Sequence, residues 1–88
     1  MQVNFTKRFS KQLDTLHDEV LRVKLRTTVS MVMAASTIRD IPHLKKLKGH
    51  LSAYRIKLGD YRIGLFIEED NVLFAAFEHR KDIYNKFP

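Results

Sequence analysis

The sequence contains no cysteine, so it offers neither a disulfide framework nor a thiolate ligand for a metal ion. It has three glycines, and none of them belongs to a glycine-rich phosphate-binding loop. No apolar run approaches the roughly 20 residues that cross a bilayer. The first residues, MQVNFTKRFSKQL, lack the apolar core of a secretory signal. We therefore expect a cytoplasmic protein with no membrane partner.

Few residues are left that could carry familiar catalytic chemistry. The histidines are dispersed, so their spacing predicts no metal site, and no cofactor is expected. The serines lack a nucleophile signature. Three acidic residues adjoin one another in a predicted turn, which argues against a catalytic carboxylate pair: Glu68, Glu69 and Asp70.

The sequence has a composition typical of a globular protein and an excess of positive charge. Its 88 residues, 44% hydrophobic and 30% charged, predict one soluble domain spanning 1–88. The net charge is +6, and residues 39–66 hold seven Lys/Arg against two Asp. Such a local excess favours a phosphate-rich partner.

The N-terminal half predicts a strand and two helices. Gln2–Phe5 alternates as a short strand, and Thr6 can then cap a helix whose apolar face repeats at helical spacing. A break at residues 14–18 offers Asp14 or Thr15 as the next cap. A longer helix follows over Asp18–Ala35. Its apolar positions keep helical spacing, and Met31 and Met33 are interpreted as core filler.

Ser36–His50 is predicted to be a connector, with Pro42 ending regular structure. It carries a basic stretch, LKKLKG, in which leucines anchor the loop and lysines face water. Two interpretations stay open for the lysines: a solvated loop, or contacts to RNA phosphates. The lysines in question are Lys45, Lys46 and Lys48.

The stretch AYRIKLGDYRIGLFI (53–67) alternates in two halves around Gly59-Asp60 and predicts a hairpin. Side chains alternate across a strand, so Arg55 and Lys57 share the face opposite the apolar residues, and Arg62 of the second strand shares it too. Like charges on adjacent strands do not stabilise a sheet, so three cations on one face indicate a site for an anion.

A polar turn at 68–71 leads to a third strand, Val72–Glu78, which is apolar on both faces. The remaining residues, 79–88, predict a short helical tail. The order β-α-α-β-β-β predicts an α+β sandwich, in which two helices cover one face of a mainly antiparallel sheet. The opposite face, with its cations, stays at least partly open.

The residues permit metal-free chemistry on RNA. Arginine offers a donor fork suited to phosphate, a lysine held among cations is a potential base, and tyrosine stacks on a nucleobase. RNA supplies its own 2′-hydroxyl nucleophile. The tail adds His79, Arg80 and Tyr84 to the set. Taken singly, each cation is more often a solvated strand residue, so the residues alone predict a basic domain that binds an anionic polymer.

The segments LKG (47–49), YRIKLGDYRIGLFI (54–67) and FEHRKDIY (77–84) resemble the RelE/ParE superfamily of toxin–antitoxin toxins. The predicted element order is similar to that family's fold. RelE-type members are ribosome-dependent endoribonucleases that cut mRNA in the ribosomal A site. ParE-type members poison DNA gyrase and generally lack the full cationic set. The resemblance therefore implies an mRNA-cleaving toxin.

The resemblance also implies roles by position. Lys57 corresponds to the general base and Arg62 to the arginine that steadies the phosphate. Arg80 corresponds to the proposed general acid and Tyr84 to the tyrosine that positions the base. Arg55 stands where well-known members have lysine, and it cannot act as a base because it stays protonated. His79, beside Arg80, could share or replace the acid role.

A cognate antitoxin that masks the basic face is the implied protein partner, with operator DNA bound indirectly through it. Two further hypotheses stay open: a non-nuclease inhibitor of gyrase, and an inactive homologue that serves as a binding module.

Overall fold

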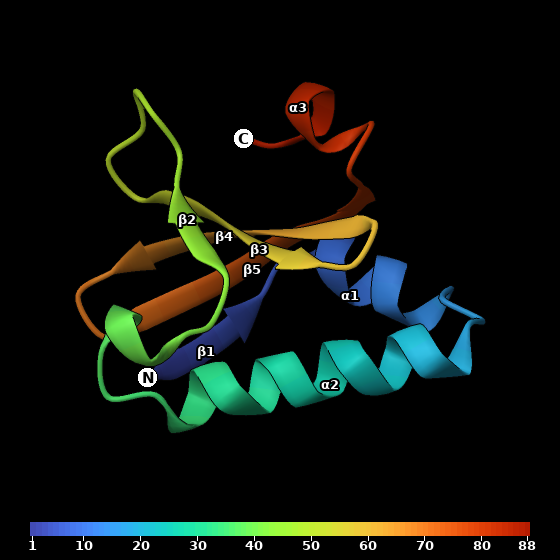
Figure 1. Cartoon of the computed structure of the whole chain (residues 1–88), viewed down its shortest axis with the longest axis horizontal. Coiled ribbons are helices and arrows are strands. Elements are labelled where there is room, and N and C mark those ends of the chain that lie inside the picture. Colours follow the sequence, from blue (N-terminus) through green and yellow to red (C-terminus); the bar gives the residue numbers. More distant parts are fainter.

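The computed structural model describes residues 1–88 as an α+β fold (Figure 1). The elements are β1 (Gln2–Phe5), α1 (Lys7–Asp14), α2 (Glu19–Ala34), the 3-10 turn η1 (Ile38–Asp40), β2 (Leu44–Lys46), β3 (Ala53–Leu58), β4 (Tyr61–Glu68), β5 (Asn71–His79) and α3 (Ile83–Lys86). The predicted order β-α-α-β-β-β with a helical tail is confirmed, with one extra short strand. None of the helices combines the length and apolarity needed to cross a membrane.

The strands form one sheet in the order β1-β5-β4-β3-β2. β1 pairs parallel to β5, and the other pairings are antiparallel. In Figure 1, α1 and α2 lie on one face of the sheet, while α3 and the C-terminus lie on the other. We call these the helix face and the outer face. β5 is flanked on both sides, in agreement with its apolar residues on both faces.

The core lies between the sheet and the two N-terminal helices. Ile56, Ile63 and Leu65 from the predicted hairpin are at most 1% exposed, and α2 contributes Leu25 and Val32. Thr6 caps α1 by accepting a hydrogen bond from the Phe9 amide at 3.1 Å, as predicted. A cap of this kind contributes about 1 kcal/mol.

Two predictions about α2 are wrong. Its cap is Asp18, which accepts from the Leu21 amide, whereas Thr15 closes α1 by donating its hydroxyl to the Lys11 carbonyl. Met31 and Met33 are 42% and 57% exposed rather than core residues. Each is one residue from buried Val32, and one residue is about 100° of helical rotation, which takes both off the buried stripe.

The predicted connector 36–50 contains regular structure after all. η1 closes with Thr37 and Asp40 capping each other's backbone, and β2 then pairs antiparallel to β3, with Lys45 opposite Arg55. Three residues are too few for an alternation to be read from sequence. Their strand geometry comes from hydrogen bonding to the neighbouring edge of β3.

The C-terminal tail docks on the outer face through a second apolar cluster of Ile83 and Phe87 with alanines of β3 and β5. The Phe87 ring lies directly on Gly64, where an added Cβ would be 2.5 Å from the ring. A bulge beside Gly64 leaves Ala75 outside the ladder, and Thr6 donates to its carbonyl at 3.2 Å. Small residues on the sheet therefore create the space that the tail fills.

This packing predicts that Gly64→Ala destabilises the fold. The added methyl would force the Phe87 ring to move, at a cost of about 1–3 kcal/mol in the free energy of unfolding. Urea unfolding would measure the change. The matched control is the same substitution in a Phe87→Ala background, where the methyl has room. An equal loss in both backgrounds would show that the ring does not occupy the space above Gly64.

Candidate functional site

The outer face of the sheet carries a row of basic side chains. Lys57 of β3 is directly opposite Arg62 of β4, and Arg55 is opposite Gly64. Directly opposed residues share a face, so the three cations lie together, as predicted. Lys45 of the unforeseen β2 pairs with Arg55 and adds a fourth cation.

Tyr84 of α3 extends over this row. Its ring centroid lies 4.7 Å from the Arg55 guanidinium carbon, a cation–π geometry. The tyrosine is 74% exposed, so its ring keeps surface available to a ligand. A stretch near the end of the chain thereby meets β3 at the centre of the basic face.

Two neighbouring cavities share Lys45, Arg55 and Tyr84. The sheet cavity, about 320 Å³, is lined by His43, Lys45, Arg55, Lys57, Arg62 and Tyr84. The loop cavity, about 400 Å³, is lined by Lys45, Lys46, Leu47, Lys48, His50, Arg55, Tyr84, Phe87 and Pro88. No acidic side chain lines either one, so both suit an anionic ligand.

The electrostatics of the site act on the Tyr84 hydroxyl. Hydrogen bonding from Arg55 and its positive charge lower the pKa of Tyr84 below the ordinary 10.0, and the charges of Lys45 and Arg62 act in the same direction. Slight desolvation opposes them. The hydroxyl therefore lies in a positive potential that would also stabilise a phosphate.

Arg62 is held in place by the β3–β4 turn. Its Nη1 donates to the Gly59 carbonyl at 2.8 Å and to the Tyr61 carbonyl at 2.9 Å. Gly59 provides the positive φ of +60° that this turn requires. One guanidinium nitrogen is thus committed to the backbone, and this fixes the side chain at the rim of the sheet cavity.

No protein-family profile matches the chain. A curated protein does: over 89 residues, covering 100% of both chains, the sequence is 34% identical to "Toxin RelE3" of Methanocaldococcus jannaschii. The chain belongs to the RelE toxin family.

Solved structures agree with this membership. The toxin fold of a RelB–RelE antitoxin–toxin complex from Methanococcus jannaschii matches with a TM-score of 0.80 and 30% identity, over 97% of this chain and 99% of that one. An archaeal RelE–RelB complex from Pyrococcus horikoshii gives 0.72 at 20% identity, over 90% and 93% of the two chains. The RelBE complex of E. coli gives 0.69 at 23%, over 89% and 94%. The last two show likeness of fold.

In this RelE-family chain, most of the predicted site residues come together. Four of the six candidate catalytic residues line the sheet cavity: Arg55, Lys57, Arg62 and Tyr84. The three lysines predicted to contact RNA all line the loop cavity, and Lys45 borders both cavities. No three His, Cys, Asp or Glu side chains come close enough to hold a metal ion.

Two predicted residues lie apart from the cavities. His79 is paired with Tyr61, edge-on to its ring at 5.5 Å, and its Nδ1 accepts from the Lys81 amide. Tyr61 packs against the core on the helix face, so His79 belongs to that face. Arg80 is 4.0 Å from Asp60 at the end of the β3–β4 turn.

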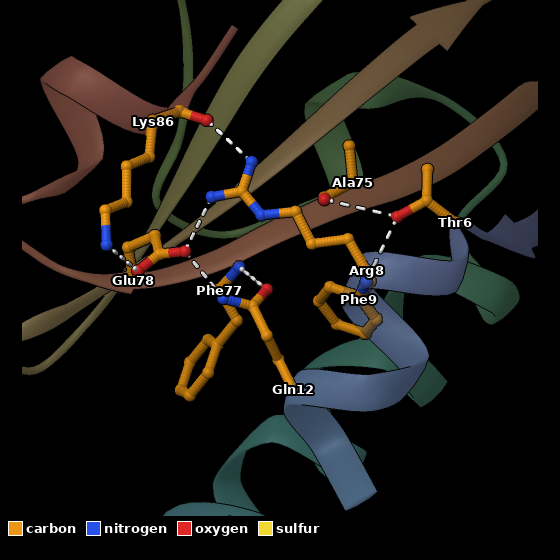
Figure 2. A network of polar contacts seen from close by, with 8 residues as sticks. All are labelled: Thr6, Arg8, Phe9, Gln12, Ala75, Phe77, Glu78 and Lys86. Carbon is orange, nitrogen blue, oxygen red and sulfur yellow. Dashed lines mark hydrogen bonds and ion pairs between the residues drawn. The ribbon is translucent and has the colours of Figure 1, made fainter. Parts of the chain in front are cut away.

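Sequence reasoning missed two residues at or beside the sheet cavity. His43 lines the sheet cavity from a left-handed position (φ 61°), and its carbonyl accepts from the Lys57 amide at 3.4 Å. Glu78 is opposite Arg62, but its carboxylate contacts Arg8 of α1 (Figure 2). The strand alternation could have placed Glu78 on the outer face, whereas no periodicity covers His43.

The position of Arg55 predicts a measurable titration. Tyr84 should ionise at lower pH in the native chain than in Arg55→Ala, because removing the guanidinium removes the main cause of its lowered pKa. Ultraviolet absorbance of tyrosinate measures this, with Tyr84→Phe identifying its contribution. Arg26→Ala, which removes an exposed charge from α2, is the control. An unchanged Tyr84 titration in Arg55→Ala would refute the contact.

Proposed function

We propose that this protein is the toxin of a toxin–antitoxin pair and a ribosome-dependent endoribonuclease that cuts mRNA in the ribosomal A site. The observation that carries the proposal is the sheet cavity, in which four cations and a tyrosine converge with no acidic side chain. A cavity that repels cations and attracts phosphate suits cleavage that needs no metal. The family, whose RelE-type members cut mRNA, agrees with this.

The proposed reaction uses the nucleophile that RNA itself supplies. The 2′-oxygen attacks the adjacent phosphorus, a new 2′-O–P bond forms, and the bond from phosphorus to the 5′-oxygen breaks. The products are a 2′,3′-cyclic phosphate and a 5′-hydroxyl. One proton leaves the 2′-hydroxyl and one joins the departing 5′-oxygen, so protons balance.

The cavity residues divide these tasks. Lys57 accepts the 2′-hydroxyl proton, a role that Arg55 and Arg62 cannot take because a guanidinium stays protonated. The two arginines stabilise the crowded phosphorane with charge-assisted hydrogen bonds. Tyr84 stacks on a base, its exposed ring backed by Arg55. The like charges of Lys57 and Arg62, unfavourable side by side without substrate, become favourable around a phosphate.

Protonation of the leaving oxygen has two candidate donors. The resemblance implies Arg80, whose side chain is directed to Asp60. His43 instead lines the sheet cavity beside Lys57 and Arg62. Imidazole exchanges protons readily near neutral pH, and guanidinium does not. We therefore assign the acid role to His43, leaving Arg80 to contact the RNA backbone.

The loop cavity extends the site along the RNA. Its lysines come from β2 and the loop that follows it, and it borders the sheet cavity at Arg55 and Tyr84. In this proposal, Lys45, Lys46 and Lys48 contact phosphates beside the cleaved bond. Such contacts carry affinity without sequence information.

The proposed partners are an antitoxin, the ribosome and mRNA. Relatives from two archaea and from E. coli were solved as RelB–RelE complexes. A corresponding antitoxin would bind this chain, mask its basic face and bring the pair indirectly to operator DNA. Ribosomes and mRNA as substrates make the cytoplasm the place of action.

Lys57→Ala is expected to lower single-turnover cleavage of ribosome-bound mRNA by about 10²–10⁴-fold, the usual contribution of a general base. Primer extension measures the cuts. Lys24→Ala, an exposed lysine on α2, is the matched control and should cleave as the native chain does. Intact cleavage by Lys57→Ala would eliminate the mechanism.

Expression in cells separates the proposal from its competitors. The nuclease predicts that methionine incorporation stops before thymidine incorporation. The reverse order would indicate a gyrase inhibitor, and harmless expression without antitoxin would indicate a binding module. Either result overturns the proposed activity.

The acid assignment predicts a leaving-group effect. His43→Ala should slow cleavage of ordinary RNA by about 10²-fold but cleave RNA with a bridging 5′-sulfur at nearly the native rate, because thiolate leaves without a proton. Lys57→Ala should cleave both substrates slowly. His79→Ala should cleave both at nearly the native rate. If Arg80→Ala, and not His43→Ala, is rescued by sulfur, Arg80 is the acid.

A further inference from the structure

The position of Tyr84 depends on contacts made by the rest of the tail. α3 is a single turn of four residues, far too short to be stable alone. Ile83 and Phe87, on either side of Tyr84, are 0% and 5% exposed and pack against the sheet. These contacts hold the turn down, but apolar packing alone is non-directional.

Polar contacts from α1 supply the direction. Figure 2 shows the Arg8 side chain extending from α1 to both β5 and the tail. One guanidinium nitrogen, Nη2, is 2.7 Å from the Glu78 carboxylate, and the other, Nη1, donates to the Lys86 carbonyl at 2.8 Å. Lys86 is the last residue of α3, where free carbonyls attract a cation.

Glu78 is a firm anchor for this bridge. Its side chain is 12% exposed and also accepts from Gln12 Nε2 at 2.6 Å, while Gln12 Oε1 accepts from the Phe77 amide. Lys86 Nζ lies 3.9 Å from the second carboxylate oxygen (Figure 2). The carboxylate is therefore fixed from β5 and α1, and Arg8 transmits that position to the tail.

We propose that Arg8, which lies outside both cavities, is a positioning residue for Tyr84: it bridges Glu78 and the Lys86 carbonyl and so fixes the tail over Arg55. The proposal rests on the proposed RNA cleavage. Arg8 touches no reacting atom. Two of its guanidinium nitrogens are bonded to the protein, whereas Arg62 of the sheet cavity has one so bonded.

Register gives Arg8 a second effect in the same direction. Glu78 is directly opposite Arg62 and on the same face, so an unheld carboxylate would compete with substrate phosphate for that arginine. In the structure the carboxylate contacts Arg8, and Arg62 contacts the turn carbonyls instead. Arg8 thus keeps the one nearby acid of the outer face turned toward α1.

A double-mutant cycle on the full chain tests the proposal. Single-turnover cleavage of ribosome-bound mRNA is measured for the native chain, Arg8→Ala, Tyr84→Ala and the double variant. Arg8→Ala should lower the maximal single-turnover rate about 10-fold, with the concentration for half-maximal rate changed by less than about twofold, as expected for a misplaced group. In the Tyr84→Ala background the same substitution should cost clearly less than in the native chain, because the residue it positions is absent and only competition from the freed Glu78 carboxylate remains.

Two further variants sharpen the comparison. Arg8→Lys retains the charge but offers no planar fork to span two partners, so it should recover only part of the lost rate. Arg26→Ala removes an exposed α2 arginine and should cleave normally. An equal loss from Arg8→Ala in both backgrounds, or no loss from Tyr84→Ala alone, would overturn the proposal.

A measurement without RNA separates this inference from the proposed activity. Arg8→Ala should speed hydrogen exchange at the Phe87 amide, which donates to the Ile83 carbonyl at 2.9 Å, while the middle of α2 exchanges as before. Unchanged exchange at Phe87 would contradict tail fixation even if the chain cuts RNA. Faster exchange in a chain that never cuts RNA would leave the bridge supported and refute the cleavage proposal.

Discussion

The ring of Phe87 lies against the backbone of Gly64, where a Cβ would come within 2.5 Å of it. This contact holds the C-terminal tail on the outer face of the sheet. Because Tyr84 is three residues earlier in the same turn, the contact also brings Tyr84 to the outer face, where its ring meets Arg55. A glycine in the middle of a strand usually weakens the strand. Here it makes room for the C-terminal tail, which lines the site opposite the sheet.

The electrostatic design follows from that geometry. Four cations on adjacent strands repel one another, and no acidic side chain in the sheet cavity relieves them. The acid that register places beside them, Glu78, is bound by Arg8, Gln12 and Lys86 instead. The repulsion is tolerated because the apolar core on the helix face stabilises the sheet independently. A bound phosphate would relieve this repulsion. Like charges on neighbouring strands are normally unfavourable, and a departure from that rule is expected where a ligand binds.

Much of this arrangement is predictable from the sequence. Alternation in residues 53–67 separates the buried isoleucines from Arg55, Lys57 and Arg62, because strand geometry allows only two faces. Elements whose structure depends on distant partners are not predictable in this way. β2 exists through pairing with β3, the tail is placed by small residues on three strands, and His43 reaches the cavity through a left-handed backbone. His79 lies on the helix face, away from the sheet cavity, because β5 continues through it.

The most direct measurement of the central claim is the chemistry of the cut ends. The full chain, free of antitoxin, is mixed with ribosomes halted on a defined mRNA, and the fragments are analysed by mass spectrometry. An attack by the 2′-hydroxyl predicts a 2′,3′-cyclic phosphate on the upstream fragment and a 5′-hydroxyl on the downstream one. A 3′-hydroxyl with a 5′-phosphate would mean that water attacks the phosphorus, and it would contradict the assignment of the sheet cavity as a metal-free RNA-cleaving centre.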